Sequence, residues 1–143
     1  MKETWEKAIE FVLKWEGGYV FNPDDPGGET NFGISKRAHP ELDIKNLTKE
    51  HAVVIYKKGY WGPIEGDLLP WPLDMIMFDT SVNCGVSRAI WFHDHAKSWV
   101  EYLFARIRFY VGLKRADIFL RGWVNRVLDL YEEIKKPPME VIK

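Results

Sequence analysis

The chain has 143 residues, of which 46% are hydrophobic and 29% charged, as is typical of one globular domain, here expected to span residues 1–143. A net charge of −1 excludes the strongly basic surface on which most nucleic-acid-binding proteins depend. Cys84 is the only cysteine, so no internal disulfide can form, and no segment approaches the roughly 20 apolar residues of a membrane-spanning helix. We therefore expect no nucleic-acid partner and no membrane insertion.

Positive charge is nevertheless concentrated in one part of the chain. Seven lysines and arginines lie between Lys97 and Arg126, against only Glu101 and Asp117. This bias is consistent with contact to an anionic polymer, and at least equally with the solvated face of a long helix.

The first predicted element is a helix over residues 4–16. Thr4 is a suitable N-cap, and apolar residues recur at helical spacing to form one buried stripe. Gly17 and Gly18 end this helix, because glycine readily adopts the left-handed conformation of a helix C-cap. Residues 19–34 have short β-prone ends around the turn-rich sequence NPDDPGGE, and they predict a small β-hairpin lobe.

Helices are predicted for most of the remaining chain. Thr48 caps a helix of about residues 49–58, and the nearly continuous apolar residues of 73–83 predict a central helix. Two longer helices follow, over 87–111 and about 116–135, and the C-terminal tail is expected to be a loose end. The predicted fold is mainly α: a helical bundle with a small β-hairpin lobe after the first helix.

Glu16 is the first candidate for chemistry. It continues the apolar stripe, four residues after Val12 and seven after Ile9, so it is expected to face the core or a cleft. It also lies in the last helical turn, where the helix dipole disfavours a negative charge. Both effects favour the protonated carboxyl, the form that a general acid for glycosidic cleavage requires. A glutamate turned into solvent at a frayed helix end is the alternative.

The lobe offers further candidates in Asp24, Asp25 and Thr30. Aspartates in a turn-rich loop normally cap turns, and a threonine in a β-prone stretch is normally structural. Glycosidases, however, usually pair their acid with a second carboxylate or a positioned water. A helix-end glutamate facing a carboxylate across a short β-lobe suits that arrangement, with Thr30 able to hold the water.

Five segments, in the right order, carry a resemblance to a known family. They are EGGY (16–19), DDPGGETNFGIS (24–35), YKKGYW (56–61), FDTSVNCGVSRAIWF (78–92) and FLRGWVNRV (119–127). Together they resemble glycoside hydrolase family 108, the N-acetylmuramidases of phages and prophages that cut peptidoglycan. The resemblance covers most of the chain and implies a lysozyme-like α+β fold. Family members commonly carry a longer peptidoglycan-binding section after VN-x-G, so this chain is similar to a compact version.

The resemblance also implies roles for individual residues. It makes Glu16 the catalytic acid. Similarity to phage-type lysozymes makes Asp25 the second carboxylate and Thr30 the residue that positions water. Asp24 remains a rival for Asp25, because the gap to Thr30 is one residue shorter here than in the phage-type pattern.

A glycan cleft is the further implication of the resemblance. The residues implied to line it are Tyr60, Trp61, Asp79 and Asn83, with Tyr19 and Trp61 able to stack on sugar rings. Asp79 and Asn83 lie four apart on one helical face, so internal bracing by hydrogen bonds is the equal alternative for this pair. No metal and no cofactor is expected, because the histidines lack ligand spacing and no glycine run matches a nucleotide motif.

The residues and the resemblance together predict a peptidoglycan hydrolase that cleaves the β-1,4 bond between N-acetylmuramic acid and N-acetylglucosamine. The sequence does not give the oligomeric state, and a monomer is favoured. Two alternatives stay open: a lytic transglycosylase that releases 1,6-anhydro products, and a non-catalytic peptidoglycan-binding module. The charged N-terminus does not resemble a signal peptide. We expect synthesis in the cytoplasm and release to the cell wall by a separate export or holin-type route, as for phage endolysins.

Overall fold

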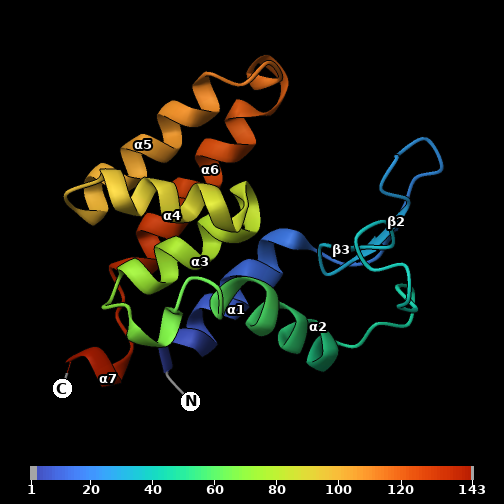
Figure 1. The fold of residues 1–143 in the computed structure, drawn as a ribbon, viewed down its shortest axis with the longest axis horizontal. Helices are drawn as coiled ribbons and strands as arrows, with labels where there is room; N and C mark the ends of the chain where they lie inside the picture. Colours follow the sequence, from blue (N-terminus) through green and yellow to red (C-terminus); the bar gives the residue numbers. More distant parts are fainter. Residues whose placement is uncertain (1–2, 143) are drawn as a thin grey trace.

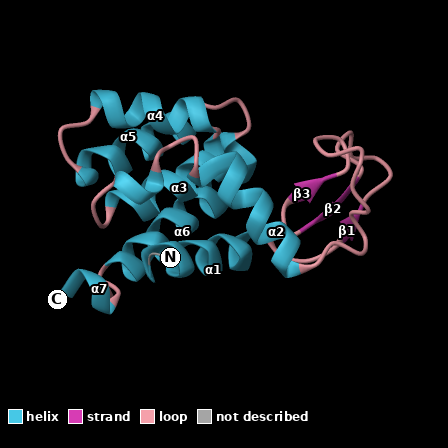
Figure 2. Ribbon diagram, turned by 60° about the horizontal axis from the view of Figure 1, so that its bottom comes forward, coloured by secondary structure: helices cyan, strands magenta, loops and turns pink. Residues whose placement is uncertain are grey.

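The computed structural model describes residues 3–142 and shows a mainly helical protein with a small antiparallel sheet to one side (Figure 1, Figure 2). The helices are α1 (Glu3–Glu16), α2 (Lys49–Tyr56), α3 (Leu73–Cys84), α4 (Val86–His95), α5 (Trp99–Val111), α6 (Ala116–Ile134) and α7 (Met139–Ile142). The strands are β1 (Val20–Phe21), β2 (Glu29–Asn31) and β3 (Ile34–Ser35). The predicted fold class is confirmed. None of the helices within residues 3–142 is long and apolar enough to span a bilayer.

Helix α1 forms and ends as its sequence predicts. Its apolar stripe, which includes Ile9 and Val12, is buried. Gly17 follows in the left-handed region at φ 77°, and its N–H donates to the Leu13 carbonyl at 3.1 Å, which closes the last turn. Glu16 is thereby the final helical residue, at the point where the chain leaves the helical body for the lobe.

The lobe is a three-stranded sheet in the order β1-β2-β3, so it contains one strand more than the predicted hairpin. In the second hairpin Asn31 pairs with Ile34, and the two residues between them form the turn. Phe32 and Gly33 have φ values of 53° and 77°, as a type I′ turn requires. The Asn31 side chain donates to the carbonyl of Ile44 at 3.0 Å and ties the sheet to the following segment.

Helix α3 is the buried centre that its apolar sequence predicts, and it packs against α1 and α4. Beside it, the rings of Trp5, Trp61 and Phe78 meet edge to face, with centroids 5.1–5.6 Å apart. Trp61 ends a π-helical turn, Lys57–Trp61, that continues α2 and turns this indole inward. Such edge-to-face aromatic pairs stabilise a core beyond the area that they bury.

One predicted helix, over 87–111, is wrong because it is two helices. Helix α4 ends at His95, and Ser98 starts α5 by accepting a hydrogen bond from the N–H of Glu101 at 3.2 Å. The Glu101 carboxylate returns to the N–H of Lys97 at 2.7 Å. Ser-x-x-Glu is a helix-start signal, and it was present in the sequence.

The C-terminal tail is also not the loose end that was predicted. It forms α7, which lies beside the start of α1. The Glu140 carboxylate accepts from the N–H of Thr4 at 2.9 Å, and the Glu3 carboxylate accepts from the N–H of Glu140 at 2.9 Å. These reciprocal bonds satisfy N–H groups that a helix start leaves free.

Candidate active site

Glu16 lies between the helical body and the lobe, with 22% of its side chain exposed. Its Oε1 atom is 2.8 Å from Nη1 of Arg126, which comes from α6. Its Oε2 atom faces the turn of the second hairpin, because a Cβ placed on Gly33 would lie only 2.7 Å from it. The carboxyl group is therefore fixed on one oxygen by an arginine and packed on the other against the lobe, and it is not turned freely into solvent.

Arg126 gives this carboxyl group a positively charged partner. Its guanidinium lies 2.8 Å from Oε1 of Glu16. The two residues are 110 positions apart in the chain. Spacing within α1 therefore gave no indication of the contact.

Asp79 of α3 joins Arg126 to a second arginine. Its Oδ1 accepts from Nε of Arg126 at 3.0 Å and lies 2.8 Å from Nη2, and its Oδ2 lies 2.7 Å from Nη1 of Arg106 in α5. Asp79 is fully buried, which by itself would raise its pKa, but the two guanidiniums outweigh burial and hold the pKa below its ordinary value. Asp79 is thus the carboxylate that both guanidiniums share, and Arg126 also contacts Glu16.

The network continues from Arg106 to the end of α3. Nε of Arg106 donates to the hydroxyl of Tyr110 at 2.7 Å, and Nη1 donates to Oγ1 of Thr80 at 3.1 Å. The Tyr110 hydroxyl in turn donates to Oδ1 of Asn83. Burial raises the pKa of Tyr110, so the phenol keeps the proton that this hydrogen bond needs. Four helices, α1, α3, α5 and α6, are thus joined through polar side chains.

Two of the predicted glycan contacts, Asp79 and Trp61, need correction. Asp79 is enclosed by two arginines and has no exposed surface, so it braces the interior and does not line a cleft. Asn83 accepts from Tyr110 and so braces the same network, but it is partly exposed, and its contact with a glycan stays a prediction. Trp61 is 1% exposed, and its indole N–H donates to Asp67 at 3.1 Å, so it cannot stack on a sugar.

The predicted contacts Tyr60 and Tyr19 are accessible. Tyr60 is half-buried, its ring lies 5.4 Å from that of Tyr56, and burial together with the negative charge of Glu16 raises its pKa. Tyr60 therefore lies near Glu16 at the junction of the helical body and the lobe. Tyr19 is 41% exposed, and its hydroxyl donates to Oε2 of Glu29 within the lobe at 2.8 Å.

The predicted partners of Glu16 in the lobe form no hydrogen bond or ion pair with it within residues 3–142. Asp24 and Asp25 lie in an exposed turn, where Oδ1 of Asp25 accepts from the N–H of Gly27 at 2.8 Å. Thr30 lies in the middle strand of the sheet. In the part of the chain that the structure describes, no hydrogen bond or ion pair joins these three residues to Glu16. Nor does any group of His, Cys, Asp and Glu between residues 3 and 142 have an arrangement suited to a metal ion.

Gly33 is the residue on which the position of Glu16 depends most directly. A Cβ here would lie 2.6 Å from the Tyr56 hydroxyl and 2.7 Å from Oε2 of Glu16, and φ is 77°. We expect Gly33→Ala to lower the free energy of unfolding by about 1–3 kcal/mol through backbone strain and also to displace the Glu16 carboxyl group. Chemical denaturation and an assay of cell-wall clearing measure the two effects.

Gly28→Ala is the matched control for this prediction. Gly28 has nearly the same φ, 70°, but nothing lies within 4 Å of its added Cβ. We expect this variant to share the backbone strain and to keep normal clearing. Equal clearing by both variants would show that the Gly33 contact does not position Glu16.

Comparison with known proteins assigns this arrangement to a family. The family model of glycosyl hydrolase 108 matches residues 9–85, more than half of the chain, including Glu16 and the whole lobe. The structure of Brucella abortus SagA is similar over 94% of this chain and 95% of that chain, with a TM-score of 0.80 and 28% sequence identity. No curated protein matched. The chain belongs to glycosyl hydrolase family 108, and this membership implies activity on peptidoglycan.

Proposed function

We propose that this protein hydrolyses the β-1,4 bond between N-acetylmuramic acid and N-acetylglucosamine in peptidoglycan, with Glu16 as the general acid. The observation that carries the proposal is the position of Glu16. It is a partly buried carboxyl group at the end of a helix, held by Arg126 on one oxygen and facing the lobe with the other. It lies within the segment that matches the family of glycosyl hydrolases.

In the proposed reaction Glu16 gives its proton to the glycosidic oxygen as the bond between that oxygen and the sugar C1 breaks. Water then completes the hydrolysis at C1. Arg126 orients the carboxyl group through Oε1, and we assign the proton to Oε2, which lies beside the turn at Gly33 where the lobe meets the helical body. We assign Asp25, with Asp24 as the rival, and Thr30 to the opposite side of the sugar. The roles of Asp25, Asp24 and Thr30 are supported by the family resemblance alone. The role of Glu16 is supported by the resemblance and by its geometry.

A lytic transglycosylase is the second candidate, and one observation favours it. No carboxylate within residues 3–142 is bonded to Glu16 or shares its arginine except the buried Asp79. A single glutamate that acts first as acid and then as base needs no second carboxylate, and it would form a 1,6-anhydro product without consuming water.

Release of soluble sugar from purified, insoluble peptidoglycan tests whether the protein is an enzyme on this substrate at all. We expect soluble muropeptides or glycan fragments to accumulate with time and in proportion to the protein. Binding to the cell wall with no soluble product would contradict the proposal and would identify a non-catalytic binding module.

A further inference from the structure

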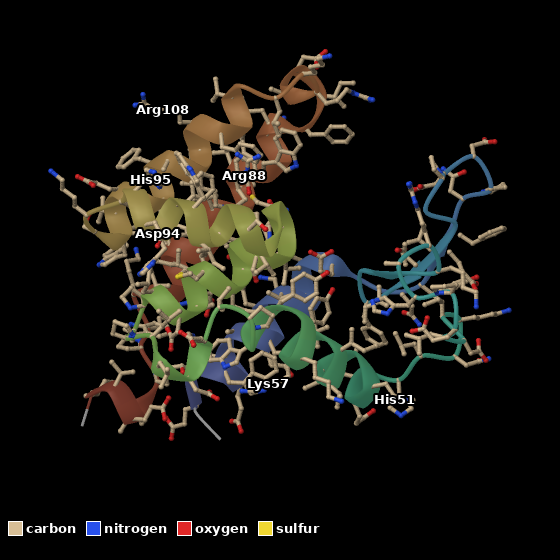
Figure 3. The ribbon with its side chains drawn as sticks, in the orientation of Figure 1. His51, Lys57, Arg88, Asp94, His95 and Arg108 are labelled. Atoms are coloured by element: carbon tan, nitrogen blue, oxygen red, sulfur yellow. The ribbon has the colours of Figure 1, made fainter. Side chains whose placement is uncertain are left out.

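A groove of about 570 Å³ lies between α4 and α5, on a face of the molecule that the network around Glu16 does not use. Figure 3 labels Arg88 and His95 of α4 and Arg108 of α5 on this side of the molecule. The volume is in the range of small-ligand sites. Most of the lining is apolar or aromatic, and its charged residues are Arg88, Arg108 and Glu101.

The two arginines of the groove differ from the arginines of the core. Arg106 and Arg126 are each paired with Asp79, whereas neither Arg88 nor Arg108 has an ion pair with any residue between 3 and 142. The Arg88 guanidinium lies 4.3 Å from the centre of the Phe109 ring, which holds it in place along the groove. Two guanidiniums without carboxylate partners in one groove indicate an anionic ligand, and planar guanidinium groups bind carboxylates well.

The remaining side chains of the groove indicate that the ligand also has apolar parts. Trp91 and Phe104 line the groove with 52% and 67% of their surface exposed, which is unusual for such large apolar residues. His95 stacks on Trp91 with ring centres 4.0 Å apart and shares a hydrogen bond with the Trp91 carbonyl at 2.8 Å. The Glu101 carboxylate, which would repel an anion, already accepts from the N–H of Lys97. The groove therefore suits a short chain with apolar parts and free carboxylates.

A second hollow adjoins the groove at the end of α3. This hollow of about 410 Å³ shares Arg88 and Trp91 with the groove and reaches Cys84. The sulfur of Cys84 is 3.6 Å from the hydroxyl of Tyr110, which belongs to the buried network. One continuous surface thus runs from the end of α3 along α4.

We propose that this groove binds the stem peptide of peptidoglycan, with Arg88 and Arg108 binding its carboxylates and Trp91 and Phe104 contacting its alkyl groups. The choice of ligand rests on the proposed function, since stem peptides supply both free carboxylates and small apolar side chains on the same polymer.

Titration calorimetry with three probes tests the proposal. They are the tetrapeptide L-Ala–D-iso-Glu–meso-diaminopimelate–D-Ala, the same peptide with its carboxylates amidated, and a peptide-free glycan oligomer. We expect the wild-type protein to bind the acidic tetrapeptide more tightly than the amidated form. Arg88→Gln and Arg108→Gln should each raise the Kd for it by at least about tenfold, because each removes a charge-assisted contact.

Arg121→Gln is the matched control, because Arg121 is exposed on α6 and does not line the groove. It should leave the Kd unchanged, and thermal melting should show that all three variants are folded. On intact peptidoglycan the double variant should have a raised KM and an unchanged kcat, and on peptide-free glycan it should behave as the wild type.

Three results would overturn the proposal: no binding of the tetrapeptide by the wild-type protein, equal binding of the acidic and amidated peptides, or equal Kd values for the wild type and the double variant. These three results can be distinguished from a failure of the proposed hydrolysis. A protein that binds the tetrapeptide through Arg88 and Arg108 but never cleaves peptidoglycan would contradict hydrolysis and leave the peptide site standing.

Discussion

Asp79→Asn is expected to lower the free energy of unfolding by about 3–5 kcal/mol, which is the usual cost of leaving a buried charge without its partner. Asp79 is the shared counter-charge of Arg106 and Arg126, and all three side chains are buried. The neutral amide would leave the two guanidiniums in the interior without the carboxylate that they share. Because the carboxylate also connects α3 to α5 and α6, the loss is expected to affect global unfolding.

Urea denaturation followed by circular dichroism measures this effect. Asp94→Asn is the matched control, because Asp94 is exposed and pairs with His93 at 3.4 Å, and such a surface pair contributes no more than about 1 kcal/mol. A loss at Asp79 as small as that at Asp94 would show that the buried network does not stabilise the fold.

The contribution of the Asp79 carboxylate should also make stability depend on pH. The folded-state pKa of Asp79 lies below its ordinary value of 3.8, so on acidification the unfolded chain binds the proton first. The contribution of this carboxylate is therefore complete above pH 3.8 and is lost as the pH falls below it toward the folded-state pKa. The free energy of unfolding of the Asp79→Asn protein should therefore decrease less on acidification than that of the wild type, as measured by urea denaturation across this pH range.

Glu16→Gln is expected to lower the rate of peptidoglycan cleavage by about 10²–10⁴-fold, the usual contribution of a general acid. The amide cannot give a proton to the glycosidic oxygen. Its oxygen can still accept the hydrogen bond from Nη1 of Arg126, so the fold and the position of the side chain should be kept. We therefore expect a loss of rate without a loss of stability. Clearing of a cell-wall suspension measures the rate, and thermal melting measures the stability.

Glu10→Gln controls for the same chemical change on the same helix. Glu10 is exposed and forms a surface ion pair with Lys49. This variant should clear the suspension at the wild-type rate. Near-normal clearing by Glu16→Gln would remove Glu16 from the chemistry.

Elements whose boundaries are set by residues close to them in the sequence could be predicted. The end of α1 at Glu16 follows from the apolar stripe and the glycine after it, and the start of α2 follows from the Thr48 cap, which accepts from the N–H of His51 at 3.2 Å. The buried position of α3 follows from its apolar run. The break between α4 and α5 had a local signal in Ser98 and Glu101, and continuous helical periodicity hid it.

Contacts between distant segments could not be predicted in this way. No local pattern indicated that Arg126 would bind Glu16, or that Trp61 would enter the core through a π-helical turn. The sequence did contain one signal for the buried Arg106. Arg106 lies four residues from both Tyr102 and Tyr110, and all three are buried, so a charged residue on a helical apolar stripe was a sign of an internal ion pair.

Mass spectrometry of the products from purified peptidoglycan tests the proposed reaction most directly, with the Glu16→Gln protein as the inactive control. We expect the wild-type protein to release fragments that end in reducing N-acetylmuramic acid, and the variant to release almost none. Fragments that end in 1,6-anhydro-N-acetylmuramic acid, lighter by one water, would contradict hydrolysis and identify a lytic transglycosylase.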